Sequence, residues 1–318
     1  MQYVLGLDFG GTKLAAGLID SSGRLIEFRR CPTDPSAGPA GAISAVQRLV
    51  DSFTTRVRPA GVGISFGGPI DQARTRTLLS HHGPGWEEYP LVEHIGRLWP
   101  GPVVMENDAN AAALGEFRFG AGRGYRNLLY VTVSTGIGGG VIINGELYRG
   151  SRGLSGEIGH TIVVPSGPLC PCGKQGCLEA VASGPSIARH YAGRSGLDPT
   201  TVTAEEVFQQ AERGNPLARE TLEWSINLLG IGLANAINLL DPDVVIIGGG
   251  VSRAGDRLFA PLRAAVAAAA APSPPGAVPI LPAALGDAVG VLGAAALVLS
   301  TSAAQPQSAQ TGQDPSDP

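Results

Sequence analysis

A unit of strand, glycine-rich turn and strand occurs twice in this chain, and it limits the possible folds more than any other feature. Each copy has two short apolar runs, at residues 3–8 and 14–19 in the first copy and at residues 128–133 and 140–143 in the second. The turns read FGGTK and STGIGG. Apolar runs around such turns are typical of β-hairpins. A repeated supersecondary unit predicts two similar lobes whose glycine turns face one cleft.

The remaining apolar periodicity alternates between short strands and longer helices. Buried strands are expected at residues 61–66, 102–106 and 244–247. Helices are expected at residues 40–56, 109–119, 183–191, 204–213, 220–240, 256–270 and 287–299. Residues 272–282 are interpreted as an irregular connection because they are rich in proline. The alternation indicates an α/β fold.

The length of 318 residues exceeds what one ordinary hydrophobic core accommodates, so we expect two lobes. We place a smaller N-terminal lobe at residues 1–116 and a larger lobe at 117–286. The last helix, about 287–300, is expected to pack back on the first lobe. Residues 301–318 are mostly polar and are predicted to form a disordered tail.

The bulk composition excludes several classes of function. A net charge of −4 argues against nucleic acid as a partner, because such proteins need a basic surface. The longest apolar run, Ala288–Leu299, is too short to span a bilayer, and the first residues lack a signal-peptide pattern. Four cysteines, of which only Cys31 stands apart, do not make a disulfide framework. We therefore expect a cytoplasmic protein without a membrane partner.

One histidine and three cysteines are concentrated in a short segment of the second half. They are His160, Cys170, Cys172 and Cys177, with the spacing H-x9-C-x-C-x4-C. This residue set is typical of a closed, tetrahedral structural zinc site. The cysteines could instead be small buried hydrophobic residues. Zinc is the better interpretation because the neighbouring proline, glycine and lysine residues make a poor core.

Two carboxylates flank this zinc segment without belonging to its ligand set. Glu157 precedes the histidine in the sequence GEIGH, and Glu179 follows the last cysteine in CLEA. A zinc ion would hold both carboxylates near one place. The segment therefore predicts a metal that shapes a substrate pocket.

Three glycine turns are candidates for phosphate binding. The free N–H groups of such turns can accept a phosphate, while an acid beside them can hold Mg²⁺. The first turn follows Asp8 and contains Gly10, Gly11, Thr12 and Lys13; the second contains Thr135 and Gly136; the third is Gly248, Gly249 and Gly250. A single turn of this kind is usually an ordinary hairpin, but three of them favour a nucleotide site.

The pair Asn107 and Asp108 lies between a predicted strand and a predicted helix. Asp108 could be a helix N-cap, a position at which aspartate is favoured. It could also be a general base that removes a proton from an attacking hydroxyl group. Asn107 could exchange hydrogen bonds with a substrate hydroxyl. The motifs HExxH and GxxxxGK[ST] do not occur, which leaves zincin and Walker-type interpretations without support. The one match to GxSxG, GISFG at residues 63–67, lies in a predicted buried strand and not at a strand-to-helix turn, so it does not support a hydrolase.

Taken together, these residues resemble the ROK family of sugar kinases and sugar-responsive repressors, from Leu5 to about Leu299. The most specific part runs from Thr135 to Glu179, with Ser155 where alanine is common. The resemblance implies an actin-like, hexokinase-like and ribonuclease H-like fold with two βββαβα-type cores. Two departures concern the segment His81–Trp86, which differs from the usual glucose pattern, and the absence of a helix-turn-helix before the first hairpin.

The resemblance also implies a role for each candidate residue. Zinc ligands are His160, Cys170, Cys172 and Cys177; sugar contacts are Gly68, Asn107, Asp108, Glu157, His160 and Glu179; the catalytic base is Asp108. The first phosphate motif is Asp8 to Lys13, the second is Thr135-Gly136, and the adenosine motif is Gly248 to Gly250.

The activity implied is that of a glycolytic, ATP- and Mg²⁺-dependent kinase that forms a hexose 6-phosphate, with glucose as the first candidate sugar. Alternatives are a kinase for fructose, N-acetylmannosamine or N-acetylglucosamine, a catalytically silent sugar-binding regulator, or a zinc-stabilised structural module. The resemblance further implies a homodimer or homotetramer.

Overall fold

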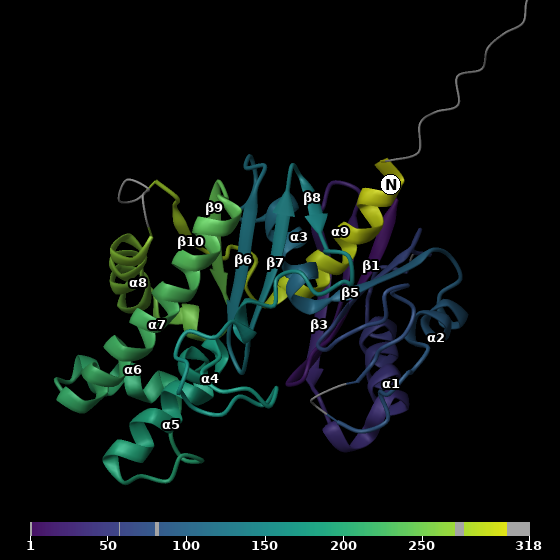
Figure 1. Cartoon of the computed structure of the whole chain (residues 1–318). Helices are drawn as coiled ribbons and strands as arrows, with labels where there is room; N and C mark the ends of the chain where they lie inside the picture. Colours follow the sequence, from purple (N-terminus) through teal and green to yellow (C-terminus); the bar gives the residue numbers. More distant parts are fainter. Residues whose placement is uncertain (1, 57, 80–82, 271–276, 304–318) are drawn as a thin grey trace, which may run out of the picture.

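Two five-stranded sheets form the frame of the molecule (Figure 1). The computed structural model describes residues 2–56, 58–79, 83–270 and 277–303. The first sheet has the order β3-β2-β1-β4-β5 and contains β1 (Tyr3–Phe9), β2 (Lys13–Asp20), β3 (Leu25–Pro32), β4 (Val62–Phe66) and β5 (Val103–Asn107). The second has the order β10-β9-β6-β7-β8 and contains β6 (Leu128–Val133), β7 (Ile137–Ile143), β8 (Glu146–Tyr148), β9 (Val244–Gly248) and β10 (Ile280–Pro282).

The two sheets repeat one topology. In the first, β1, β2 and β3 are antiparallel neighbours, and β4 and β5 extend the other side of β1 in parallel. In the second, β6, β7 and β8 are antiparallel neighbours, and β9 and β10 extend the other side of β6 in parallel. The internal duplication and the α/β class predicted from the two hairpins are therefore confirmed.

The helices divide into an outer set on each sheet and a pair between the sheets (Figure 1). The outer helices of the first sheet are α1 (Gly38–Asp51) and α2 (Leu91–Leu98). Those of the second are α4 (Leu178–Ala182), α5 (Gly184–Ser195), α6 (Ala204–Glu212), α7 (Pro216–Leu240) and α8 (Asp256–Ala269). The described residues also include the short 3₁₀ turns η1 (Pro35–Ala37), η2 (Ile158–His160), η3 (Val251–Ala254) and η4 (Gly286–Ala288).

The central pair is α3 (Asp108–Phe119) and α9 (Val289–Ala303), which pack on each other. Helix α9 lies on β1 and β4 of the first sheet, whereas α3 lies on β6 and β7 of the second. The contact is backbone to backbone, since a Cβ atom at Gly6 would lie 2.1 Å from Val291 O and one at Gly63 would lie 1.8 Å from Ala294 O. Small residues on the strands thus allow the last helix to lie directly on the first sheet.

The buried carboxylate of Glu116 on α3 joins both connections between the sheets. The chain crosses once between α3 and β6 and again between β10 and α9. Glu116 is fully buried and accepts hydrogen bonds from Ala121 N on the first connection and from Ala284 N and Leu285 N on the second. This side chain, which the sequence did not single out, holds both crossings at one point.

Several boundaries differ from expectation for local reasons. Residues 272–282 were predicted to be irregular, but β10 lies at their end and pairs with β9. Helix α7 begins at Pro216, four residues before the predicted start at 220, because Asn215 caps it through Leu217 N and Ala218 N. Of the tail predicted to be disordered at 301–318, residues 301–303 belong to α9 instead, and residues from 304 on lie outside the described residues. Among the described helices, none has the length and apolar character needed to cross a membrane.

Candidate functional site

Asp8 lies at the end of β1 beneath the first glycine turn. Its carboxylate is buried and accepts a hydrogen bond from Ser65 Oγ at 2.8 Å. Burial raises the pKa of Asp8, and the hydrogen bond from Ser65 and the positive charge of Lys13 counteract that rise. A cation beside this buried carboxylate stabilises its ionised form. This is the environment expected for a metal or phosphate site.

The first turn is held in shape by its own backbone and by the neighbouring segment. Gly10 N donates to Lys13 O at 3.1 Å, and Thr33 Oγ1 donates to Gly10 O at 2.7 Å. Within the described part of the chain, the N–H groups of Gly11 and Thr12 make no backbone hydrogen bond. These two groups are therefore available to an anion.

The second and third turns lie against each other at the carboxyl ends of β6 and β9. Ser134 N donates to Gly136 O at 2.9 Å, which closes the second turn and leaves Thr135 exposed. In the third turn, a Cβ atom at Gly249 would lie 2.4 Å from Val133 O. Gly249 also has a φ of +86°, which favours glycine. Close packing thus brings two predicted nucleotide motifs together.

Asp108 is the first residue of α3, and the structure gives the N-cap to its neighbour. Asn107 Oδ1 accepts from Ala109 N at 3.0 Å and from Asn110 N at 3.4 Å. Asn107 Nδ2 donates to Gly68 O at 3.2 Å. Asp108 Oδ1 accepts from Ala109 N at 2.9 Å, and its Oδ2 points toward Gly67, 3.6 Å from where a Cβ atom would lie. The capping role suggested for Asp108 thus belongs to Asn107, and one carboxylate oxygen of Asp108 remains for chemistry.

The surroundings of Asp108 raise its pKa to about 7. Burial of the carboxylate is the main cause, and the negative charges of Asp8 and Glu157 add to it. A general base is most effective when its pKa lies near the working pH. Asp108 is therefore poised to accept a proton at neutral pH.

This pKa predicts a pH dependence of kcat/KM. A general base must be deprotonated, so kcat/KM should fall about tenfold per pH unit below about pH 7 and level off above it. The affinity for the nucleotide expected from the sequence, measured over the same pH range, is the control for a change in nucleotide binding. A profile that is flat between pH 5.5 and 8 would contradict the role of Asp108.

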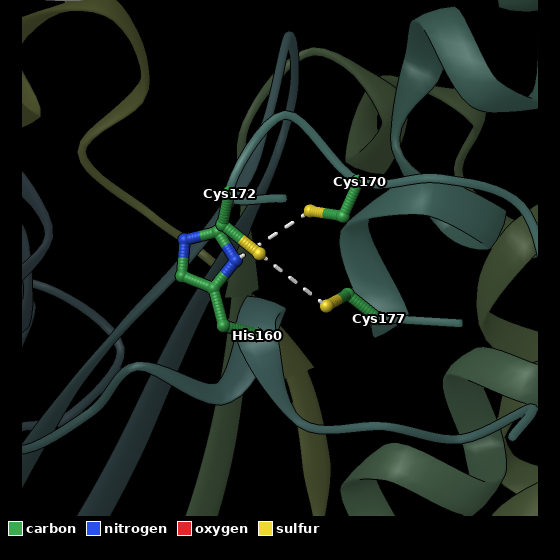
Figure 2. Close-up of side chains that lie close together, drawn as sticks. All are labelled: His160, Cys170, Cys172 and Cys177. Carbon is green, nitrogen blue, oxygen red and sulfur yellow. Dashed lines mark hydrogen bonds between the residues drawn. The ribbon is translucent and has the colours of Figure 1, made fainter. Parts of the chain in front are cut away.

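The cysteine segment forms a compact cluster around one point (Figure 2). The ligand atoms of His160, Cys170, Cys172 and Cys177 all lie within 4.8 Å of one another. Cys170 Sγ is 3.7 Å from His160 Nδ1, and Cys172 Sγ is 3.6 Å from Cys177 Sγ. Bonds of about 2.3 Å to a tetrahedral zinc ion place two sulfur atoms roughly 3.8 Å apart. The four side chains therefore fit a metal ion.

The local backbone explains why the cysteines converge. Cys170 N donates to Lys174 O at 2.7 Å and Gly173 N donates to Cys170 O at 2.9 Å, which forms a tight turn. Gly173 and Gly176 have φ values of +85° and +74°, as a turn of this kind requires. Burial raises the pKa of the Cys170 thiol to about 12. A bound cation would instead favour the deprotonated thiolate form of this cysteine.

The two flanking carboxylates connect the cluster to the rest of the site. Glu179 Oε2 accepts from Ile137 N at 2.9 Å, next to the second turn, while its Oε1 lies 4.0 Å from Cys170 Sγ. Glu157 Oε2 lies 3.8 Å from His160 Nε2, and the charge of Glu157 acts on Asp108. The cluster thus lies between the second turn and Asp108.

A half-buried ion pair next to Asn107 and Asp108 was not found from the sequence. Arg149 Nε, which follows β8, donates to Glu106 Oε2 at 2.6 Å. Glu106 Oε1 accepts from Asn107 N at 3.1 Å and from Asn110 Nδ2 at 3.3 Å. The pair joins the two sheets and supports Asn107. Its only sequence signal was that Glu106 directly precedes Asn107 and Asp108.

The chain is similar to known proteins over most of its length. The model of the ROK family matches residues 4–301. The chain is 35% identical over 308 residues to the glucokinase of Thermotoga maritima, covering 93% of this chain and 96% of that protein. It is 37% identical over 251 residues to the N-acetylmannosamine kinase of Escherichia coli O157:H7, covering 79% of this chain and 84% of that protein. The crystal structure of a Streptomyces griseus ROK family glucokinase with glucose and AMPPNP superposes with a TM-score of 0.81 at 35% identity, covering 93% and 98%. The actin-like fold expected from the resemblance is confirmed.

Proposed function

Because the chain belongs to the ROK family, we propose that it transfers the γ-phosphoryl group of ATP to the C6 hydroxyl of a hexose, with glucose as the preferred sugar. The observation that carries this proposal is Asp108, whose pKa of about 7 suits a base and whose second carboxylate oxygen points toward Gly67, a residue that itself lies against Gly10 of the first glycine turn. The glucokinase relatives support glucose as the sugar.

The proposed reaction is an in-line transfer of the γ-phosphoryl group. Asp108 accepts the proton of the C6 hydroxyl, and the oxygen forms a bond to the γ-phosphorus in line with the leaving group. The bond from that phosphorus to the bridging oxygen of ADP breaks, which yields sugar 6-phosphate, ADP and a protonated Asp108. Catalysis of this kind depends on positioning and on stabilisation of phosphate charge. The N–H groups of Gly11 and Thr12 and the turn at Thr135 and Gly136 would bind the phosphates, and the turn at Gly248–Gly250 the adenosine.

Mg²⁺ fits the surroundings of Asp8. Burial works against the ionised form of this carboxylate, and a divalent cation would stabilise that form. When bound, the ion would neutralise charge on the donor phosphates. Asp8 would hold it, through water or directly.

Zinc fits the cluster of His160, Cys170, Cys172 and Cys177. Four protein ligands leave no open coordination position, so the ion would be structural and take no part in proton transfer. It would orient His160, Glu157 and Glu179, which we propose as sugar contacts together with Asn107 and Gly68. Removing the ion should therefore weaken sugar binding.

The segment that departs from the usual glucose pattern lies partly outside the described residues, since His81 and His82 are not among them. Its end is well anchored. Trp86 is buried and its ring packs against Phe66 and Phe9, at centroid distances of 5.0 Å and 6.1 Å. This contact places Trp86 against the ends of β1 and β4, from which the first turn and Gly67 follow.

A panel of sugars tests the proposal. ADP release from the purified protein is measured with ATP, Mg²⁺ and glucose, fructose, mannose, N-acetylmannosamine or N-acetylglucosamine. We expect the highest kcat/KM with glucose and no turnover with 6-deoxyglucose, which lacks the acceptor hydroxyl. Preference for N-acetylmannosamine would favour the second candidate function, an N-acetylmannosamine kinase, which the similarity to the E. coli enzyme supports. No sugar-dependent ADP release at all would leave a sugar-binding regulator or a structural module.

Several further expectations remain proposals. We propose a cytoplasmic homodimer or homotetramer with no nucleic-acid or membrane partner. We also keep the division into lobes at residues 1–116 and 117–286, with the last helix packing back on the first lobe.

A further inference from the structure

Asp287 collects three positively charged side chains from three parts of the chain. Lys13 Nζ lies 3.5 Å from its Oδ1, Arg253 Nη2 lies 2.7 Å from the same oxygen, and Arg30 Nη1 donates to its Oδ2. Lys13 Nζ also donates to the backbone oxygen of Asp287 at 3.3 Å. These charges lower the pKa of Asp287, although partial burial opposes them. The sequence did not single out this acid.

Two of these cations, Lys13 and Arg253, come from opposite sides of the nucleotide site proposed above, and the third, Arg30, lies on β3. Lys13 is the last residue of the first glycine turn and begins β2. Arg253 belongs to η3, which directly follows the third turn at Gly248–Gly250. Asp287 lies in η4, on the connection that leads from the second sheet to α9. One carboxylate therefore joins the nucleotide turn of one sheet to that of the other.

The segment that carries Asp287 also touches the buried acid of the site. A Cβ atom at Gly290 would lie 2.4 Å from the carboxyl carbon of Asp8. The ammonium group of Lys13 acts on Asp8 as well, since its charge counteracts the rise in pKa caused by burial. The Lys13 charge is thus located between Asp8 and Asp287, where donor phosphates would approach.

We propose that Asp287 is a positioning residue for the phosphoryl donor, which holds Lys13 and Arg253 so that the phosphates of ATP meet two cations already in place. This inference rests on the proposed kinase function and assigns a role within the same site. Three cations around one anion leave a surplus of two positive charges for the phosphates. Ordering the cations before binding removes an entropic cost from the binding step.

Exposed ion pairs usually contribute little, so the arrangement matters more than the number of pairs. The side chains of Lys13 and Asp287 are only 34% and 35% exposed, and Lys13 is held by both a carboxylate and a backbone oxygen. Without Asp287, three like charges would face one another and their side chains would separate. The sign of the effect is informative, because removing a negative charge by Coulomb's law alone would strengthen phosphate binding.

The test compares Asp287→Asn with the wild-type protein. We expect the KM for ATP to rise about tenfold, equivalent to about 1.4 kcal/mol, with the KM for the sugar and the melting temperature nearly unchanged. Asp287→Glu keeps the charge and should recover part of the loss. Asp256→Asn, an exposed substitution in the first turn of α8 with the same change in charge, is the matched control and should behave as wild type.

A double-mutant cycle shows whether Asp287 acts through its partner. In a Lys13→Gln background, Asp287→Asn should raise the KM for ATP by much less than tenfold. An unchanged or lowered KM for ATP in the single variant overturns the inference. So does a parallel rise in the sugar KM with a large fall in melting temperature, which would indicate a purely structural role.

The same question can be answered without catalysis. Calorimetric titration with a non-hydrolysable ATP analogue should show about tenfold weaker binding to the Asp287→Asn variant. If the wild-type protein releases no ADP with any sugar, the proposed function fails, and this titration still decides the role of Asp287. Equal affinities of wild type and variant would refute the positioning role alone.

Discussion

Asp108→Asn should lower kcat by about 10²–10⁴-fold and leave the KM for the sugar within about twofold of the wild-type value. Asparagine has the shape of aspartate, and its oxygen can still accept from Ala109 N as Asp108 Oδ1 does. It cannot accept a proton from the sugar hydroxyl. The loss should therefore fall on the chemical step, and steady-state kinetics with glucose and ATP would measure it.

The same experiment needs a control for the lost charge. Asp51→Asn makes the same substitution at the exposed end of α1 and should leave kcat unchanged. In the Asp108→Asn variant, the remaining activity should also lose its rise with pH up to about pH 7, because the titrating group is gone. A kcat close to that of wild type would remove Asp108 from the mechanism.

Cys172→Ser should cost zinc and sugar affinity together. Cys172 is exposed, so the substitution removes a metal ligand with little loss of packing. We expect about one zinc ion per chain in the wild type and almost none in the variant. The KM for glucose should rise about 10–100-fold, because the ion would orient His160 and both flanking glutamates.

Elemental analysis by mass spectrometry, thermal unfolding and sugar kinetics together measure this effect. Cys31→Ser is the matched control, since Cys31 lies on β3 away from the cluster and should keep zinc, stability and KM. Removal of zinc from the wild type by a chelator should reproduce the variant. A zinc-free protein with a normal KM would falsify the link between the metal and the sugar pocket.

Features that depend on neighbouring residues in the chain were predictable. The hairpins at β1-β2 and β6-β7 follow from apolar runs around glycine turns, and the first lies within a residue of where the pattern placed it. In the second, β7 begins at Ile137, three residues before the predicted start at 140, so the turn is shorter than the sequence STGIGG suggested. The His160 and Cys170–Cys177 cluster likewise converges through a short turn with glycines at the required φ values. In each case the contacts are local, so periodicity and spacing carry the necessary information.

Features that join residues far apart in the sequence were not predictable from it. Glu116, which links Ala121 to Ala284 and Leu285, and the pair of Glu106 with Arg149 have no signal in the sequence that names their partners. Strand β10 was missed for a similar reason, because its pairing with β9 defines it more than its own three residues do. The stability of such elements comes from tertiary contacts rather than local propensity.

Asp108 illustrates the difference between what the sequence determines and what only the tertiary structure decides. The sequence alone determined that an Asn-Asp pair stands between a strand and a helix, that glycine turns recur with the first of them next to Asp8, and that four residues can bind one metal ion. Only the tertiary structure decided that Asn107 caps the helix, that burial beside Asp8 and Glu157 raises the pKa of Asp108, and that Asp287 bridges two turns. The reason is physical: burial and charge coupling depend on distances between segments that only the packed chain defines. The cap at Asn107 is a local contact, but which residue of the pair occupies it depends on where α3 begins.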